Sequence, residues 1–106
     1  MQADEYQEAT RETAIYPKDI GVQYCVLGLT NEAGEVAGKY KKFLRDGSDW
    51  HDVKQMLVDE LGDVLWYATR LADELDFDLS EVMERNLAKL RSRAARGTLG
   101  GSGDKR

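Results

Sequence analysis

The sequence predicts an all-α protein, a bundle of four to five helices around a central antiparallel helical hairpin, assembled as an oligomer. Apolar residues recur at helical spacing along most of the 106 residues, and no segment alternates apolar and polar residues as a half-buried strand does. The content of 42% hydrophobic and 33% charged residues, with one proline, is typical of a helix-rich globular chain. A domain of this size buries only about two-thirds of the surface of its unfolded chain, so partner subunits are expected.

The first two helices are predicted on either side of Pro17. The first runs from about Ala3 to Ala14 and ends there because proline disfavours the helical conformation at the residue before it. The second runs from about Asp19 to Leu44. Its apolar stripe at helical spacing consists of Ala33, Val36, Ala37, Tyr40 and Leu44.

Gly47 and Ser48 break the helical pattern and predict a loop. A third helix is expected from about Asp52 to Leu75. One face of it is apolar and carries Leu57, Leu61, Val64, Leu65, Ala68, Leu71, Ala72 and Leu75.

The fourth helix is expected to end the folded domain. Ser80 is predicted as its N-cap, with Glu81 at its positive end, and the helix continues to about Ala95. We therefore divide the chain into a domain over residues 1–96 and a glycine-rich tail over residues 97–106.

Composition and charge exclude several classes of protein. The net charge is −5 and no basic stripe occurs before the C-terminal segment, which argues against a partner that is a nucleic-acid polymer. No apolar run is long enough for a membrane span, and the opening "MQADEYQEAT" has no signal-peptide pattern, so the cytoplasm is the expected location. The lone Cys25 lies in an apolar stretch and is predicted to be a buried thiol.

One short pattern occurs twice, as "NEAGEV" at residues 31–36 and "DELGDV" at residues 59–64. Within each copy two acids are three positions apart and share a helix face. The two copies are mirrored about the loop, so an antiparallel hairpin brings all four acids to about the same level. These acids are Glu32, Glu35, Glu60 and Asp63.

Four converging carboxylates repel one another unless cations lie among them. Oxygen ligands without His or Cys favour Mg²⁺, for which Mn²⁺ can substitute, and two divalent ions would roughly neutralise the cluster. A ferritin-like di-iron site is not expected, because the only histidine, His51, lies in the loop. Gly34 and Gly62 lie inside the acid pairs, where a glycine is explained by close approach of a second helix or of a ligand.

This four-acid pattern resembles the metal-binding signature of the all-α nucleoside triphosphate pyrophosphohydrolases, the MazG-like family. The segments "LGLTNEAGEVAGKYKKFLRDG" and "DELGDVLWYATRLADEL" resemble the family's central hairpin, and "NLAKLRSR" resembles its last helix. The ending "RGTLGGSGDKR" is similar to that of small single-domain members from bacteria and phages.

The resemblance implies a homodimer or homotetramer that uses Mg²⁺ to cleave a nucleoside triphosphate into a monophosphate and pyrophosphate. The four acids would then be metal ligands, and Glu35 or Glu32 would also orient the attacking water as the catalytic carboxylate. The implied role is house-cleaning of nucleotide pools, with non-standard or excess dNTPs as substrates.

Basic and aromatic side chains are expected to complete the site. Lys39 follows Glu35 by four positions, which fits either phosphate contact or a salt bridge with that acid. By the resemblance, Lys89 and Arg93 match basic positions of the family's last helix that contact phosphates, the alternative being a solvated face near the helix C-terminus. Asn86 shares their stripe, and Lys105 and Arg106 of the glycine-rich tail are candidates to fold over the phosphates. Base stacking is expected from Tyr67 and, more weakly, Tyr24; Trp50 and Trp66 are further aromatic candidates.

Other functions remain open at this stage. A phosphoribosyl-ATP pyrophosphohydrolase would share the fold and the acids. A non-catalytic helical module would either bind nucleotide without turnover or carry the acids only as a solvated face. The preferred base, the number of metal ions and the choice between dimer and tetramer are not determined by the sequence.

Overall fold

The structure, a computed structural model that describes residues 1–106, contains helices and no strand. This confirms the all-α prediction. Four α-helices and two short 3-10 helices make up the chain. The α-helices are α1 (Ala3–Thr10), α2 (Gly21–Asp46), α3 (Trp50–Glu74) and α4 (Leu79–Ala95), and the 3-10 helices are η1 (Arg11–Thr13) and η2 (Lys18–Ile20).

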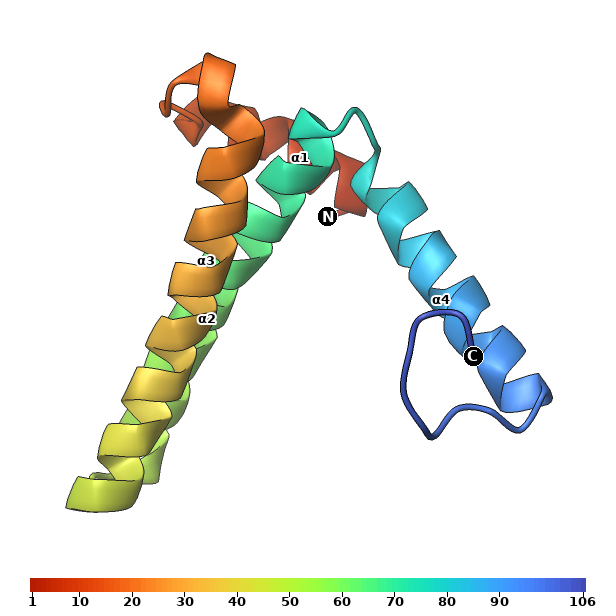
Figure 1. The fold of residues 1–106 in the computed structure, drawn as a ribbon. Coiled ribbons are helices and arrows are strands. Elements are labelled where there is room, and N and C mark those ends of the chain that lie inside the picture. The colour runs from red at the N-terminus through yellow and green to blue at the C-terminus, as the bar shows by residue number, and fades with distance from the viewer.

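Helices α2 and α3 lie side by side and run in opposite directions along their whole length (Figure 1). Gly47 ends α2 in the left-handed conformation, at φ 67°, and its N–H donates to the Phe43 carbonyl at 2.8 Å. Asp49 then caps α3 by accepting from the His51 N–H at 2.8 Å. The break predicted at Gly47 and Ser48 is therefore the turn of this helix pair.

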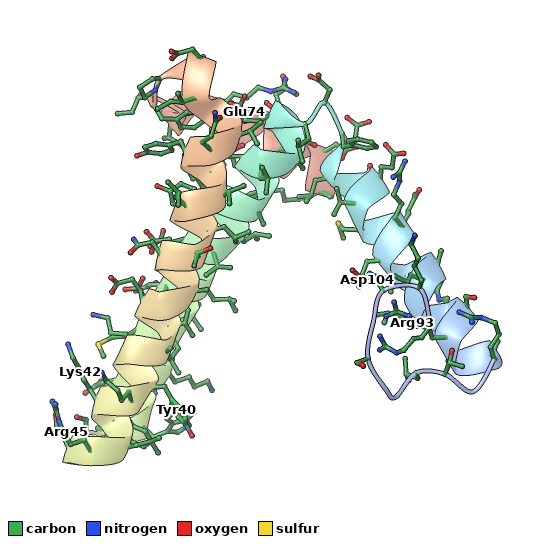
Figure 2. All side chains as sticks on the ribbon, in the orientation of Figure 1. Tyr40, Lys42, Arg45, Glu74, Arg93 and Asp104 are labelled. Carbon is green, nitrogen blue, oxygen red and sulfur yellow. The ribbon has the colours of Figure 1, made fainter.

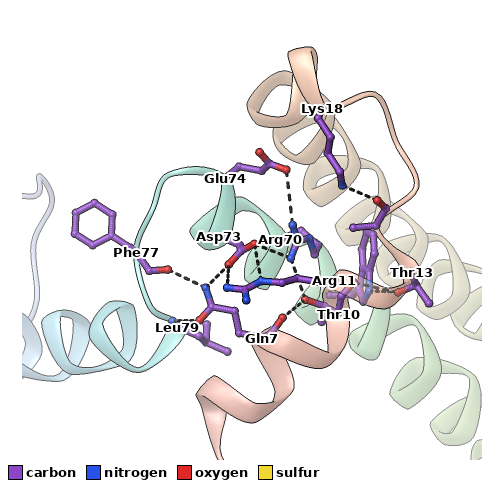
Figure 3. Close-up of polar contacts among 12 residues, drawn as sticks. Gln7, Thr10, Arg11, Thr13, Lys18, Arg70, Asp73, Glu74, Phe77 and Leu79 are labelled. Atoms are coloured by element: carbon purple, nitrogen blue, oxygen red, sulfur yellow. Dashed lines mark hydrogen bonds and ion pairs between the residues drawn. The ribbon is translucent and has the colours of Figure 1, made fainter.

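Helix α1 crosses α3 near the open end of this pair and is held there by polar contacts (Figure 3). Arg70 of α3 is only 3% exposed and forms an ion pair with Asp73 at 3.0 Å. Its guanidinium also donates to the Tyr16 hydroxyl at 3.2 Å and to the Thr10 hydroxyl at 3.3 Å. Arg11 of η1 also pairs with Asp73, at 2.8 Å, so one carboxylate joins η1 to α3.

The start of α4 differs from the prediction. Its N-cap is Asp78, which makes no side-chain cap bond, and Ser80 lies inside the helix. The cap comes from α1 instead: the Leu79 N–H donates to Gln7 Oε1 at 2.6 Å, and the Ser80 N–H donates to Asp4 Oδ1 at 3.0 Å. Sequence alone missed this because the capping residues lie more than 70 positions away.

Helix α4 does not pack along the hairpin but diverges from it, so the chain has the outline of a V (Figure 1). Only 12 of 106 residues are buried, too few for a closed helical bundle within one protomer. The protomer therefore has two helical arms with exposed apolar side chains and no complete bundle of its own. No helix has the length and apolar character that crossing a membrane requires.

Candidate metal and nucleotide site

Three of the four predicted acids meet across the α2–α3 pair. Carboxylate oxygens of Glu32 from α2, and of Glu60 and Asp63 from α3, all lie within 4.8 Å of one another. Glu32 and Glu60 are half-buried, while Asp63 is exposed. The mirrored spacing about Gly47 produces this meeting, because residues equally far from the turn of an antiparallel pair lie at the same level.

The carboxylates of this cluster carry like charges, which repel one another. The pKa of Glu32 is raised, first by burial and then by the charges of Asp63, Glu60 and Glu35. No lysine or arginine side chain forms an ion pair with Glu32, Glu60 or Asp63. An oxygen-only donor set of this charge fits a hard divalent cation such as Mg²⁺.

Glu35 lies at the edge of the cluster. Its side chain is exposed, and it is not among the three carboxylates that approach within 4.8 Å, although its charge is felt at Glu32. Lys39, one helical turn further along α2, is half-buried and forms no ion pair with Glu35. The salt bridge considered for this pair is therefore absent.

The glycines of the acid pattern do not serve contact between the two helices. A Cβ at Gly34 or at Gly62 would meet nothing within 4 Å, so close approach of α2 and α3 does not explain either one. Gly28 is different, because a Cβ there would overlap the ring of Tyr67. The close approach predicted for the acid pattern is found six positions before Gly34 on α2, where an aromatic side chain packs against Gly28.

Tyr67 is thereby placed beside the acid cluster. Its pKa is raised, first by burial and then by the neighbouring Tyr24 hydroxyl, with the charge of Glu32 also contributing. The Tyr67 and Tyr24 ring centroids are 6.2 Å apart, and Tyr24 in turn stacks on Tyr16 at 5.0 Å. The other aromatic candidates lie elsewhere: Trp66 donates to the Thr13 hydroxyl at 3.0 Å, and Trp50 packs on Phe43 at the turn.

The polar residues of α4 are not beside the acids within one protomer. Asn86 and Lys89 are exposed and line a groove of about 390 Å³ at the corner between α3 and α4. Arg85, which the sequence analysis did not select, lines the same groove and lies over the Phe77 ring at 4.7 Å. The divergence of α4 from the hairpin keeps this groove away from the turn end of the hairpin (Figure 1).

The remaining basic candidates are engaged in the tail. Arg93 is 5% exposed and donates to the Asp104 carbonyl at 2.7 Å, and Arg106 donates to four carbonyls of the tail. Lys105 is exposed. Figure 2 shows Arg93 within the loop that the tail forms beside α4.

Tyr6 of α1 is a neighbour of the cluster that the sequence analysis missed. Its pKa is raised by burial and then by the charge of Asp63. The helical spacing of α1 gave no reason to select Tyr6, because its proximity to Asp63 depends on how α1 crosses α3. Only the tertiary arrangement reveals it.

Comparisons with known proteins show the family to which the chain belongs. Residues 21–97 match the MazG nucleotide pyrophosphohydrolase domain, a range that begins with α2 and contains both acid pairs. The chain is 48% identical over 114 residues to Gene 37 protein of Mycobacterium phage L5, and the alignment covers 100% of both proteins. No solved structure matches the chain.

Proposed function

Because the chain belongs to the MazG nucleotide pyrophosphohydrolase family, we propose that it hydrolyses nucleoside and deoxynucleoside triphosphates to monophosphate and pyrophosphate, in a Mg²⁺-dependent reaction that cleans nucleotide pools. The observation that carries the proposal is the meeting of Glu32, Glu60 and Asp63 within 4.8 Å across α2 and α3. Like charges held this close, with the pKa of Glu32 raised and no basic partner, are expected where a cation is bound.

The carboxylates would divide the chemistry between them. Glu32, Glu60 and Asp63 would hold Mg²⁺, which when bound supplies positive charge to the phosphates and lowers the pKa of water. Glu35, exposed at the edge of the cluster, is free to accept a hydrogen bond from the attacking water and to orient it in line with the leaving pyrophosphate. Glu32, three positions before Glu35 on the same face of α2, is the second candidate for that role.

Positive charge for the phosphates would come from Lys39 on α2 and from the α4 groove lined by Asn86 and Lys89. A triphosphate carries about four negative charges, more than the metal ions alone can offset at an acidic site. Within one protomer α4 diverges from the hairpin, so we propose that a second copy brings its α4 to the acids in a homodimer or homotetramer. The base would stack on Tyr67, with Tyr24 behind it.

The test is phosphorus NMR of each common NTP and dNTP incubated with Mg²⁺ and the protein. We expect the wild type to release pyrophosphate and monophosphate, and Glu35→Gln to lose at least about a hundredfold in rate if it orients the water. Asp59→Asn is the matched control, because it removes a charge from an exposed position next to the cluster but outside it.

Other results of the same experiment would identify other functions. Turnover only of a phosphoribosyl nucleotide would favour a phosphoribosyl-ATP pyrophosphohydrolase. No loss of any triphosphate, combined with Mg²⁺-dependent nucleotide binding, would contradict hydrolysis and favour a nucleotide-binding module. Equal rates for Glu35→Gln and the wild type would remove Glu35 from the mechanism.

A further inference from the structure

The C-terminal tail, residues 97–106, is held mainly by arginine side chains, and beyond Thr98 no backbone N–H donates to a backbone carbonyl. Arg106 donates to the carbonyls of Thr98, Leu99, Gly100 and Gly103, at 2.5–3.2 Å. Arg93 donates to the Asp104 carbonyl at 2.7 Å and to the Gly103 carbonyl at 3.4 Å. The carbonyl groups of the tail are thus turned toward two guanidinium groups.

The N–H groups of the same segment are unused. None of the backbone N–H groups from Leu99 to Arg106 donates a hydrogen bond within the protein. Gly101 and Gly103 adopt positive φ, at 89° and 91°, a conformation that other residues rarely take. In this turn the carbonyls accept hydrogen bonds from side chains of the protein, while successive backbone N–H groups remain free. Successive free N–H groups are the donors of an anion-binding loop.

Two buried polar atoms, one from the end of α4 and one from the tail, also have no hydrogen-bond partner. They are Nε of Arg93, a residue that is only 5% exposed, and Oγ1 of Thr98. The Thr98 N–H donates to the Arg93 carbonyl at 2.8 Å, so the two residues are adjacent. A buried N–H donor and a buried hydroxyl without partners are costly unless a ligand or water satisfies them.

The local charge selects the sign of that ligand. Residues 93–106 contain four basic side chains, Arg93, Arg96, Lys105 and Arg106, and one acid, Asp104. The Asp104 carboxylate is 95% exposed and lies as far as 4.0 Å from the Arg93 guanidinium. Its charge is therefore largely hydrated. The segment is therefore strongly cationic in a protein of net charge −5.

We propose that the tail is a phosphate-binding loop. Arg106 is a positioning residue that holds the loop closed, and Arg93 both holds the loop through its Nη2 and contacts the ligand through its free Nε. The free backbone N–H groups and Thr98 Oγ1 are the other contacts. The ligand class is a pyrophosphate group, either within the nucleotide or as the released product. This rests on the proposed function for its biological role, but binding to the loop needs neither the acid cluster nor Mg²⁺. The exposed Lys105 adds charge at the rim of the loop.

The first test is a titration of the ¹⁵N-labelled full-length protein with sodium pyrophosphate in EDTA, followed by amide NMR. We expect saturable shifts at the amides of Gly100, Gly101 and Gly103. Thr98→Val keeps the backbone bonds that close the loop but removes the free hydroxyl, and should weaken binding about tenfold. Unshifted glycine amides in the wild type would overturn the proposal.

Arg93→Lys separates positioning from charge. Lysine keeps the charge but lacks the planar fork that reaches two carbonyls, so the glycine amides should move to unfolded positions and the saturable shifts should be lost. The matched control is Arg91→Lys, an exposed position on α4 outside the loop, which should titrate like the wild type. Wild-type binding by Arg93→Lys would show that charge alone suffices and would overturn the positioning role.

A second ligand distinguishes the two sources of the phosphate. A dNTP analogue with a methylene group between the α and β phosphates cannot be cleaved there. Glycine shifts with both compounds would assign the loop to the substrate, and shifts with pyrophosphate alone would assign it to the product; either supports a pyrophosphate-binding loop. Because these titrations contain EDTA, an absence of hydrolysis in the phosphorus NMR assay would not affect their result.

Discussion

Arg70 and Arg93 are the two buried arginines of the chain, and they differ in how their donors are satisfied. Arg70 pairs with Asp73 and Glu74 and donates to two hydroxyl groups, so its charge and its N–H groups have partners inside the protein. Arg93 keeps an unpartnered Nε. The first arrangement is structural, and the second is expected where a ligand completes the contacts.

Asp73→Asn tests the structural arrangement. The Arg11 hydrogen bond, assisted by the charge of Arg70, holds the pKa of Asp73 below its ordinary value of 3.8 despite partial burial. A depressed folded-state pKa contributes stability above pH 3.8 that is lost as the pH falls through the folded pKa. We expect the variant to lose about 2 kcal/mol of unfolding free energy at pH 7, because the buried Arg70 keeps fewer partners.

Urea unfolding at several pH values between 7 and 3 measures this difference. The difference in unfolding free energy between the variant and the wild type should be constant above about pH 5 and shrink at lower pH, first as Asp73 becomes protonated in the unfolded wild type and then in the folded one. Asp59→Asn, at an exposed position, is the control and should stay within about 0.5 kcal/mol of the wild type. A difference that does not depend on pH would contradict the role of the charge.

Gly28→Ala tests whether the Tyr67 ring packs against Gly28 of α2. Alanine in a helix interior is normally about 1 kcal/mol better than glycine, but a Cβ at Gly28 would overlap the Tyr67 ring. We expect a net loss of about 1–3 kcal/mol in unfolding free energy, since the ring must move. Gly38→Ala, where a Cβ meets nothing within 4 Å, should instead stabilise the protein. Stabilisation by both substitutions would mean that Tyr67 is not seated against α2.

At the scale of elements, α1 acts as the cap of α4. Asp4 accepts from both the N–H and the hydroxyl of Ser80, at 3.0 and 2.8 Å, and Gln7 accepts from the Leu79 N–H. The first turn of a helix leaves N–H groups without partners inside the helix, so these contacts fix where α4 begins and how it leaves α3. The divergence of the two arms thus depends on two side chains of the first helix.

Asp4→Ala should therefore cost about 1 kcal/mol of unfolding free energy and increase hydrogen exchange at the Ser80 amide. Glu5→Ala is the control: Glu5 also lies in the first turn of α1, but the hydrogen bonds to the start of α4 come from Asp4 and Gln7. Urea unfolding and amide exchange by NMR measure the two effects. Unchanged exchange at Ser80 in Asp4→Ala would argue against capping by α1.

The same elements show how far the sequence could predict this structure. The hairpin was predictable because its apolar stripes, its glycine turn and its mirrored acids are all local patterns with a known period. The N-cap of α4 was not, because Ser80 fits the local rule while the observed cap comes from Asp4 and Gln7, through a contact between distant segments. The tail was not either, since its fold depends on where two arginine side chains find carbonyl partners.

The candidate site, too, was predictable from the sequence only in part. Spacing alone predicted that Glu32, Glu60 and Asp63 lie together. In an antiparallel pair, residues at equal distances from the turn lie at the same level along the two helices. It did not place Glu35 outside the tight cluster, which depends on how far each carboxylate lies from the seam between the helices. It also could not place α4, whose direction is set by packing and caps at the corner.

The whole molecule exposes apolar stripes on both arms of the V. On α3, Val58, Leu61 and Leu65 recur at helical spacing and are 47–60% exposed, and on α4 Met83, Leu87 and Leu90 are 37–51% exposed. Leu65 and Met83 line one mostly apolar groove of about 340 Å³ where α1, α3 and α4 meet, so both stripes start from the same place. Apolar stripes of this length are expected to be covered by another chain.

Leu61→Glu tests whether a second copy covers these stripes. Leu61 is 60% exposed, so the substitution should hardly affect an isolated protomer but should bury a charge in an assembled one. We expect sedimentation to show a dimer or tetramer for the wild type and mainly monomer for Leu61→Glu, with the dissociation constant raised at least about tenfold. Ile15→Glu, in the 94% exposed position between α1 and α2, is the control and should assemble normally.

The melting temperature of the wild type should also rise with protein concentration, as mass action requires for a folded oligomer. A monomeric wild type, or identical sedimentation of Leu61→Glu and the wild type, would leave the stripes uncovered and would contradict assembly through α3.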